Sequence, residues 1–153
     1  MTEPTIPQLF DLTGRVALIT GGSGYLGGSL ARALAEAGAT VVVASRDRQR
    51  AQESAAALPT VAGAAHHGVV LDHLDEASLQ TGFDAAVAAA GQVDILINNG
   101  QQGHALDLTN VTAEAFNRDL QNATGYFLLA RLLRDHVVGR EAPGSVVMIG
   151  SMY

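Results

Sequence analysis

The stretch that decides the fold is TGGSGYLG, residues 20–27, in which Gly22, Gly24 and Gly27 form the pattern GxGxxG. The apolar run at residues 16–20 leads into it and is typical of a strand buried on both faces. After the glycines, apolar side chains recur at helical spacing over residues 25–37, and Gly38 follows where helices commonly end. This part of the sequence predicts a strand, a glycine turn and a helix.

The same alternation continues along the rest of the chain. We expect strands at residues 40–44, 68–71, 93–97 and 145–149, and helices at 47–58, 76–90 and 113–138, the last being one long helix or a broken pair. Strands that alternate with helices imply right-handed crossovers and a parallel sheet. No linker or charge run divides residues 1–153, so we predict a single α/β domain. Its doubly wound sheet would have the strand order 3-2-1-4-5 and a ligand crevice at the carboxyl ends of the strands.

Composition excludes several other classes of protein. The nine basic residues are scattered and the formal net charge is -6, which argues against nucleic-acid binding. The sequence contains neither a basic start followed by an apolar run nor an uninterrupted apolar stretch of about 18 residues, so we expect a cytoplasmic protein without a membrane partner. The absence of cysteine rules out thiolate metal sites, and His66, His67 and His73 lack a paired carboxylate at ligand spacing. We therefore predict no metal site.

The glycine turn itself indicates a ligand. Between a strand and a helix, glycines allow a backbone to approach a pyrophosphate closely, and the free N–H groups of the helix start favour its negative charge. The turn therefore predicts dinucleotide binding. The residues expected to contact the dinucleotide are Gly21, Gly22, Ser23, Gly24, Leu26 and Gly27.

The residues at the end of the second expected strand should determine whether the protein binds NAD or NADP. An acid there would bind both ribose hydroxyls, whereas a hydroxyl followed by a guanidinium would bind a 2′-phosphate. The sequence places Ser45 and Arg46 at this point, which favours NADP, with NAD as the alternative. Asp47 has two interpretations, because it either caps the following helix or turns toward the ribose.

Four further segments carry patterns downstream of the glycine turn. They are Asp72 after the third expected strand, NNG at residues 98–100, NATGYF at 122–127 and GSVVMIGS at 144–151. In this order, and together with the glycine turn, they resemble the short-chain dehydrogenase/reductase family over nearly the whole chain. The resemblance implies a Rossmann-like fold and an NAD(P)-dependent oxidoreductase that moves hydride between nicotinamide and a small carbonyl or alcohol substrate.

The resemblance also implies roles for individual residues. Asp72, with His73 beside it, is similar to the family's acid that bonds the adenine, and Asn99 lies in the turn that touches the cofactor ribose. Asn122 resembles the family's structural and catalytic asparagine, and Ser151 resembles its catalytic serine. A homo-oligomer, dimer or tetramer, is implied through helices that include residues 113–138.

Two departures from the family's pattern keep alternatives open. Tyr25 stands where much of the family has glycine, and the turn also fits TGxxGxxG, which is the spacing of the extended, epimerase-like subgroup. Gln101 replaces the usual glycine of the asparagine turn, so we expect a remodelled loop at residues 100–106. The doubled asparagine and the segment at 122–127 favour the ordinary dehydrogenase subgroup over a nucleotide-sugar epimerase or dehydratase.

The resemblance implies a tyrosine acid/base with a lysine four residues later, and this pair has no counterpart here. Tyr25, Tyr126 and Tyr153 lack such a lysine, and Tyr153 lies too close to Ser151 to be assigned a catalytic role. We therefore expect the sequence to be part of a longer protein, with a sheet that is incomplete on its C-terminal side and a fifth strand that forms an exposed edge. We expect no turnover from this chain alone. The alternative is a nucleotide-binding module without catalysis.

Overall fold

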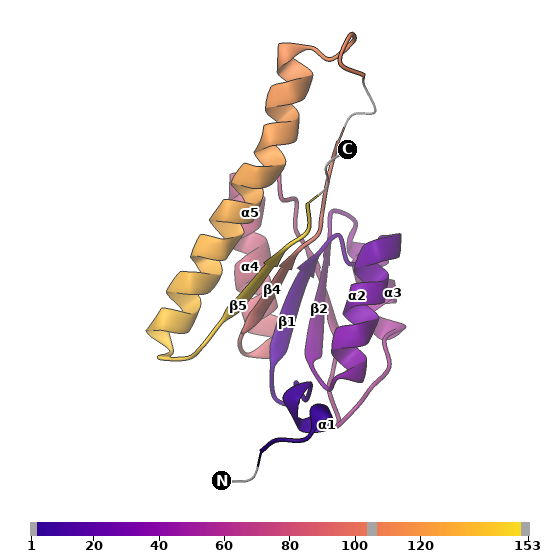
Figure 1. Cartoon of the computed structure of the whole chain (residues 1–153), viewed down its shortest axis with the longest axis vertical. Helices are drawn as coiled ribbons and strands as arrows, with labels where there is room; N and C mark the ends of the chain where they lie inside the picture. Colours follow the sequence, from indigo (N-terminus) through magenta and orange to yellow (C-terminus); the bar gives the residue numbers. More distant parts are fainter. Residues whose placement is uncertain (1–2, 104–106, 151–153) are drawn as a thin grey trace.

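The computed structural model describes residues 3–103 and 107–150 (Figure 1). In chain order, the elements are α1 (Ile6–Leu9), β1 (Val16–Thr20), α2 (Tyr25–Glu36), β2 (Thr40–Ser45), α3 (Arg48–Ala56), β3 (His67–Val70), α4 (Glu76–Ala90), β4 (Ile95–Asn98), α5 (Ala113–Gly139) and β5 (Ser145–Met148). Strands and helices alternate from β1 to β5, as the sequence predicts.

The five strands form one parallel sheet in the order β3-β2-β1-β4-β5, which confirms the predicted topology. Strand β1 lies at the centre, between β2 and β4, and all five of its residues are buried. Its register pairs Val16 with Thr40 and Ala17 with Ile95. Because β1 is central, the turn that follows it opens between the ends of its two neighbours.

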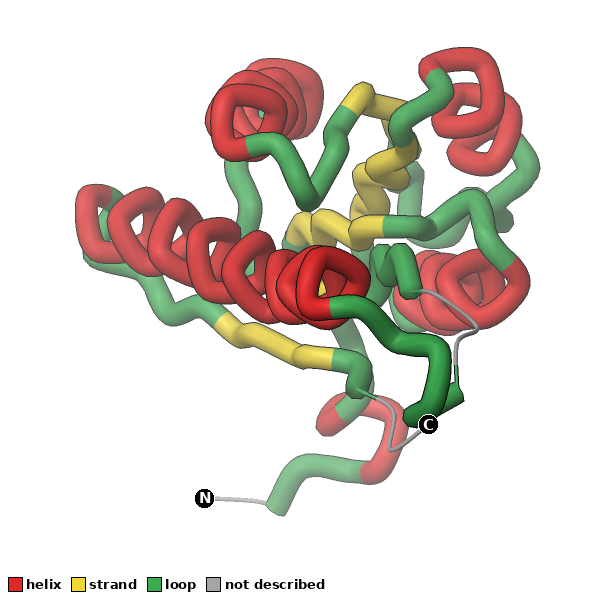
Figure 2. The backbone as a smooth tube through the Cα atoms, turned by 90° about the horizontal axis from the view of Figure 1, so that it is seen from above, coloured by secondary structure: helices red, strands yellow, loops and turns green. Residues whose placement is uncertain are grey.

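Helices cover both faces of the sheet, with α2 and α3 on one side and α4 and α5 on the other (Figures 1 and 2). Successive residues of β1 serve the two faces, because Leu18 belongs to the core under α4 and α5 whereas Ile19 belongs to the core under α2 and α3. On the second face Ala31 and Ala35 are fully buried, so α2 approaches the sheet closely. The crossovers therefore build a three-layer doubly wound fold.

The structure departs from the predicted elements in a few places. The long helix α5 is continuous, so the broken pair is not what the chain forms. The short helix α1 was not predicted, because it buries no residue and so has no apolar periodicity. Strand β4 starts two residues later than expected, at Ile95. Among the described residues, no helix combines the length and the apolar character that a membrane span requires.

Candidate functional site

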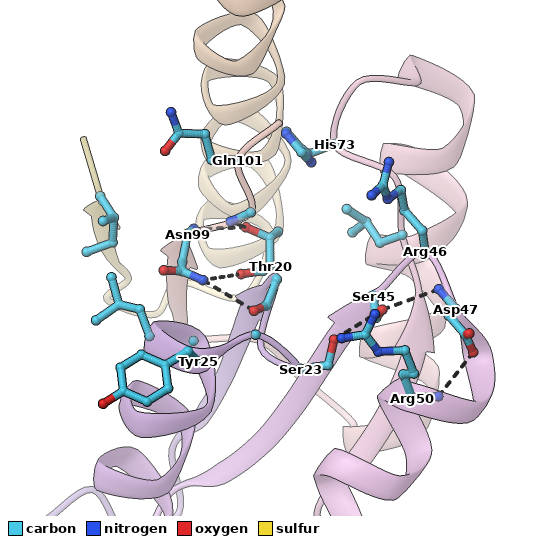
Figure 3. A pocket seen from close by; sticks show the side chains of 17 residues that line it. Thr20, Ser23, Tyr25, Ser45, Arg46, Asp47, Arg50, His73, Asn99 and Gln101 are labelled. Atoms are coloured by element: carbon cyan, nitrogen blue, oxygen red, sulfur yellow. Dashed lines mark hydrogen bonds between the residues drawn. The ribbon is translucent and has the colours of Figure 1, made fainter. Parts of the chain in front are cut away.

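A cavity of about 580 Å³ opens at the carboxyl ends of β1, β2 and β4 (Figure 3). Its described lining comprises Thr20, Gly21, Ser23, Gly24, Tyr25, Leu26, Gly27, Ser45, Arg46, Asp47, Arg50, Leu71, His73, Asn99, Gly100, Gln101 and Ile149. In Figure 3, Thr20, Tyr25 and Asn99 lie on one side, and Ser45, Arg46, Asp47 and Arg50 lie on the other. The glycine turn joins the two sides. This is the crevice that the sheet topology predicts.

At two positions of the glycine motif, glycine is required for steric reasons. Gly21 has φ +62°, a left-handed conformation that other residues adopt with strain. Gly27, on the first turn of α2, packs so closely on the turn that a Cβ there would overlap the carbonyl oxygen of Gly21. The turn is closed by a hydrogen bond from Gly24 N to Gly21 O at 3.0 Å. The glycines therefore bring the start of α2 directly onto the end of β1.

The start of α2 is built differently from the starts of the other long helices. Asp47, Asp75 and Thr112 each accept a backbone N–H at the starts of α3, α4 and α5. Helix α2 begins at Tyr25, after the N-cap residue Gly24, with no side-chain cap within the described structure, and its first turn lines the cavity. The N–H groups of that turn are thus available to an anion in the cavity, where the helix dipole favours negative charge.

The loop after β4 holds the end of β1 in place. The Asn99 amide donates to the carbonyl oxygens of Thr20 at 3.1 Å and Gly21 at 3.3 Å. In return, the Thr20 hydroxyl accepts the backbone N–H groups of Asn99 at 3.0 Å and Gly100 at 2.9 Å. Tyr126 of α5 adds a hydrogen bond from its hydroxyl to the carbonyl oxygen of Gly100 at 3.1 Å, and burial raises the pKa of this phenol. These bonds tie β1, β4 and α5 together at the cavity floor.

The segment from the end of β2 to the first turn of α3 supplies two cations and a hydroxyl. Ser45 lies 3.3 Å from the hydroxyl of Ser23 and accepts the backbone N–H of Asp47 at 3.3 Å. The Asp47 carboxylate accepts the backbone N–H of Arg50 at 3.1 Å and so caps α3, which is the first of its two predicted interpretations. Arg46 and Arg50 both line the cavity, whereas the intervening Arg48 does not. This wall is therefore positively charged although the chain as a whole carries -6.

His73 and Asn122 meet beside the cavity. His73 lines the cavity and is 7% exposed, and its Nε2 lies 2.7 Å from Oδ1 of Asn122. The same Oδ1 accepts the backbone N–H of Gln102 at 2.9 Å, and Nδ2 of Asn122 donates to the carbonyl oxygens of Gln102 and Asp119, each at 2.9 Å. With two bonds accepted and two donated, the amide of Asn122 is saturated by the protein.

Most of the predicted nucleotide-binding residues meet at one cavity. Those that line it are Gly21, Ser23, Gly24, Leu26, Gly27, Ser45, Arg46, His73 and Asn99, whereas Gly22 and Asp72 do not. Asp72 turns into its own loop, where its carboxylate accepts the N–H of Leu74 at 3.0 Å. Asn122 adjoins the cavity through His73, and Ser151 lies outside the described residues.

Sequence reasoning missed several residues of the lining. Thr20, Leu71, Gly100 and Ile149 were not predicted, although Thr20 ends β1 and Gly100 follows the doubled asparagine. Their positions at or just beyond strand ends were the available signal. Leu71 and Ile149 carried no chemical signal, because an apolar residue after a strand resembles any other core residue.

The neighbouring histidines have structural partners. His66 accepts the N–H of Val41 through Nδ1 at 3.0 Å, and its Nε2 lies 3.1 Å from the carbonyl oxygen of Pro59. His73 is engaged with Asn122 instead. Across residues 3–103 and 107–150, no group of three or more histidine, aspartate or glutamate side chains is arranged to hold a metal ion.

Comparison with known proteins agrees with this geometry. The family model described as short chain dehydrogenase matches residues 15–153, and the chain therefore belongs to that family. It is 31% identical to D-threitol dehydrogenase of Mycolicibacterium smegmatis over 91% of this chain and 53% of that protein. It is 38% identical to polyprenol dehydrogenase of Mus musculus over 95% of this chain and 44% of that protein. The chain thus spans about half the length of these curated relatives.

Solved structures show the same likeness. A short-chain type dehydrogenase/reductase from Mycobacterium marinum has a TM-score of 0.86 and 30% identity, with 97% of this chain and 58% of that chain covered. The 3-ketoacyl-(acyl-carrier-protein) reductase from Brucella melitensis, crystallised with NADH, has a TM-score of 0.81 and 32% identity, with 92% and 58% covered.

Proposed function

We propose that this chain binds a nicotinamide adenine dinucleotide in the cavity described above. We further propose that the protein is an oxidoreductase acting on a small carbonyl or alcohol substrate. The observation that carries the proposal is the first turn of α2, which opens into the cavity without a side-chain cap beside a glycine turn. The family membership and the NADH in the related Brucella structure support it. The cavity volume, about 580 Å³, lies in the range of roughly 300–1,000 Å³ that ligand pockets occupy.

Each part of the cavity suits a different part of the nucleotide. The uncapped N–H groups of α2 would hold the pyrophosphate, and Asn99 would keep the glycine turn in the conformation that this requires. His73, in the loop after β3, would lie on the adenine side, with Asp72 shaping that loop. When bound, the nicotinamide supplies the hydride chemistry, which is a property of the cofactor itself.

We favour NADP over NAD because of the wall at the end of β2. Arg46 and Arg50 bring two guanidinium groups to the cavity, and a guanidinium forms charge-assisted hydrogen bonds with a phosphate. Asp47 also lines the cavity, but its carboxylate accepts the N–H of Arg50 and caps α3, and the two guanidinium groups outnumber this one carboxylate. A 2′-phosphate would therefore meet positive charge at this wall.

We propose that hydride transfer requires more groups than this chain provides. Asn122 and Ser151 are the candidates for two of the family's four catalytic roles, and no tyrosine here has a lysine four residues later. The phenol of Tyr126 is a poor substitute, because burial raises its pKa and the anionic form is disfavoured. We therefore expect nucleotide binding without turnover when the chain is assayed alone.

Titration calorimetry with NADP⁺ and NAD⁺ tests the assignment. The unmodified chain should bind NADP⁺ more tightly, and Arg46→Ala should weaken NADP⁺ binding by about 10- to 100-fold, since hydrogen bonds to charged groups contribute about 1.5–3 kcal/mol. Arg48→Ala removes the same charge two residues away, outside the cavity, and is the matched control. Equal affinity for the two dinucleotides would refute the NADP assignment. Binding of neither would refute the nucleotide site.

A further inference from the structure

We propose that Gln102 is a positioning residue that holds the guanidinium of Arg46 ready for a 2′-phosphate, an inference that rests on the proposed function. Nη1 of Arg46 donates to Oε1 of Gln102 at 2.9 Å. Arg46 follows β2 and Gln102 lies in the loop after β4, so the hydrogen bond joins the two strands that flank β1. It therefore connects the two sides of the cavity.

The Gln102 end of this hydrogen bond is firmly anchored. The Asn122 amide binds the backbone of Gln102 in both directions, accepting its N–H and donating to its carbonyl oxygen, each at 2.9 Å. Asn122 is 8% exposed and is itself engaged with His73, which is 7% exposed. The backbone of Gln102 is thus fixed to one buried side chain, which a second buried side chain holds in turn. An exposed arginine is in this way linked to the interior of the protein.

The hydrogen bond between Arg46 and Gln102 leaves the positive charge of Arg46 available to a ligand. Arg32, Arg134 and Arg140 each pair with a carboxylate, whereas Arg46 makes no ion pair within the described residues and bonds a neutral amide instead. An amide oxygen occupies one of the five N–H donors of a guanidinium and leaves its charge uncompensated. The Gln102 side chain therefore restricts Arg46 without neutralising it. A phosphate would find the remaining donors already oriented, which lowers the entropy lost on binding.

Two nucleotides that differ in the 2′-phosphate test the proposal. Adenosine 2′,5′-bisphosphate and adenosine 5′-monophosphate would be titrated into the chain, with dissociation constants taken from NMR chemical shifts. We expect Gln102→Ala to weaken binding of the bisphosphate about three- to tenfold and that of the monophosphate less than about twofold, because only an ordering contribution is lost. Gln102→Glu should weaken bisphosphate binding at least as much, because its carboxylate would neutralise Arg46.

A double-mutant cycle separates positioning from a general effect on the loop. In the Arg46→Ala background, Gln102→Ala should cause no further loss, since the proposed role acts through Arg46. Gln80→Ala, which removes an exposed glutamine on α4 that bonds Asp84 and does not line this cavity, is the control and should change neither affinity. Unfolding midpoints would be recorded for every variant.

The outcomes distinguish the role of Gln102 from the proposed binding of NADP. If the unmodified chain prefers the bisphosphate and Arg46→Ala abolishes that preference while Gln102→Ala does not, the role of Gln102 is refuted and the NADP assignment stands. Equal losses for both nucleotides on Gln102→Ala also refute it, because they indicate a general loop defect. If the unmodified chain shows no preference, or binds neither nucleotide, both proposals fail.

Discussion

The side chain of Asn99 donates a hydrogen bond to the backbone oxygen of Thr20 at 3.1 Å, so the loop after β4 holds the last residue of β1. The two residues are 79 positions apart in sequence. They meet because β1 and β4 are parallel neighbours whose carboxyl ends lie at the same edge of the sheet. The conformation of the glycine turn therefore depends on a side chain from the loop after a neighbouring strand.

Asn99→Ala should loosen the turn. The substitution removes donors to the oxygens of Thr20 and Gly21, and we expect the free energy of unfolding to fall by about 1–2 kcal/mol. NADP⁺ affinity should fall by about tenfold, because the turn would no longer be fixed before binding. Urea unfolding and calorimetric titration measure the two effects. Asn110→Ala removes an exposed asparagine that bonds Asp107, and should change stability by less than about 0.5 kcal/mol.

Two adjacent glycines of α2 should respond to alanine in opposite ways. At Gly27 a Cβ would overlap the backbone oxygen of Gly21, whereas at Gly28 a Cβ would meet only the oxygen of Gly22 at 3.7 Å outside its own helix, an ordinary contact. We expect Gly27→Ala to displace α2 from the turn and to weaken dinucleotide binding by at least about tenfold. Gly28→Ala should raise stability by about 0.5–1 kcal/mol through helix propensity and leave binding intact.

Thermal unfolding and NADP⁺ titration of both variants give the comparison. Because both variants add one methyl group to the same helix turn, they differ chiefly in what that methyl group meets. Similar affinities for Gly27→Ala and Gly28→Ala would show that the close contact with Gly21 is not required for binding.

The fold was predictable because its signals are local. Residues 16–20 and 76–90 were predicted with both ends as the structure has them. Helix α4 has a chemical signal at each end, since Asp75 accepts two backbone N–H groups at its start and Gly91 adopts φ +83° after its last turn. Helix α1 buries nothing and left no comparable pattern. Strong local patterns therefore sufficed for the elements, and their alternation around the glycine turn indicated the doubly wound sheet.

The candidate site was predictable only in part, for a related reason. The glycine turn is continuous in sequence, so its residues were found together. The contacts of Gln102 with Arg46 and with Asn122 join segments 56 and 20 residues apart, and no spacing rule indicates such pairs. Asp47 left two interpretations because a helix cap and a ribose-binding acid use the same carboxylate. In the structure this carboxylate caps α3 and also lines the cavity, and the direction of a side chain cannot be read from sequence.

A buried cluster at the amino ends of β1 and β4 should contribute to stability without contributing to nucleotide binding. Asp94 is 2% exposed, and its carboxylate accepts the N–H of Val16 at 2.9 Å and bonds Arg140 at 3.1 Å. Asp94→Ala removes both interactions and should lower the free energy of unfolding by about 2–4 kcal/mol. NADP⁺ affinity per folded molecule should stay within about twofold, because this cluster lies at the amino ends of β1 and β4.

An exposed ion pair supplies the control for the buried one. Arg32 and Glu36 pair on the surface of α2, and Glu36→Ala should cost only about 0.3–0.5 kcal/mol. Urea unfolding of both variants measures the difference. Equal losses for Asp94→Ala and Glu36→Ala would contradict the role given to burial at Asp94.

His136 predicts a dependence of stability on pH. Its Nε2 accepts the backbone N–H of Val93 at 3.2 Å, which requires an unprotonated ring nitrogen. Burial lowers the pKa of His136, and the neighbouring Arg140 lowers it further, while Asp94 acts in the opposite direction. On acidification the unfolded chain therefore takes up a proton near the ordinary histidine pKa of about 6.5, before the folded protein does.

It follows that the contribution of His136 is complete above about pH 6.5 and is lost as the pH falls from there to the lower pKa of the folded state. His136→Gln keeps an acceptor for Val93 and cannot be protonated, so the variant should lose less stability between about pH 7.5 and pH 5.5 than the unmodified chain does. Urea unfolding at several pH values measures both proteins. Carboxylates titrate in both, so the difference between the two curves isolates His136. Parallel curves would mean that the proton uptake of His136 is the same in the folded and unfolded states.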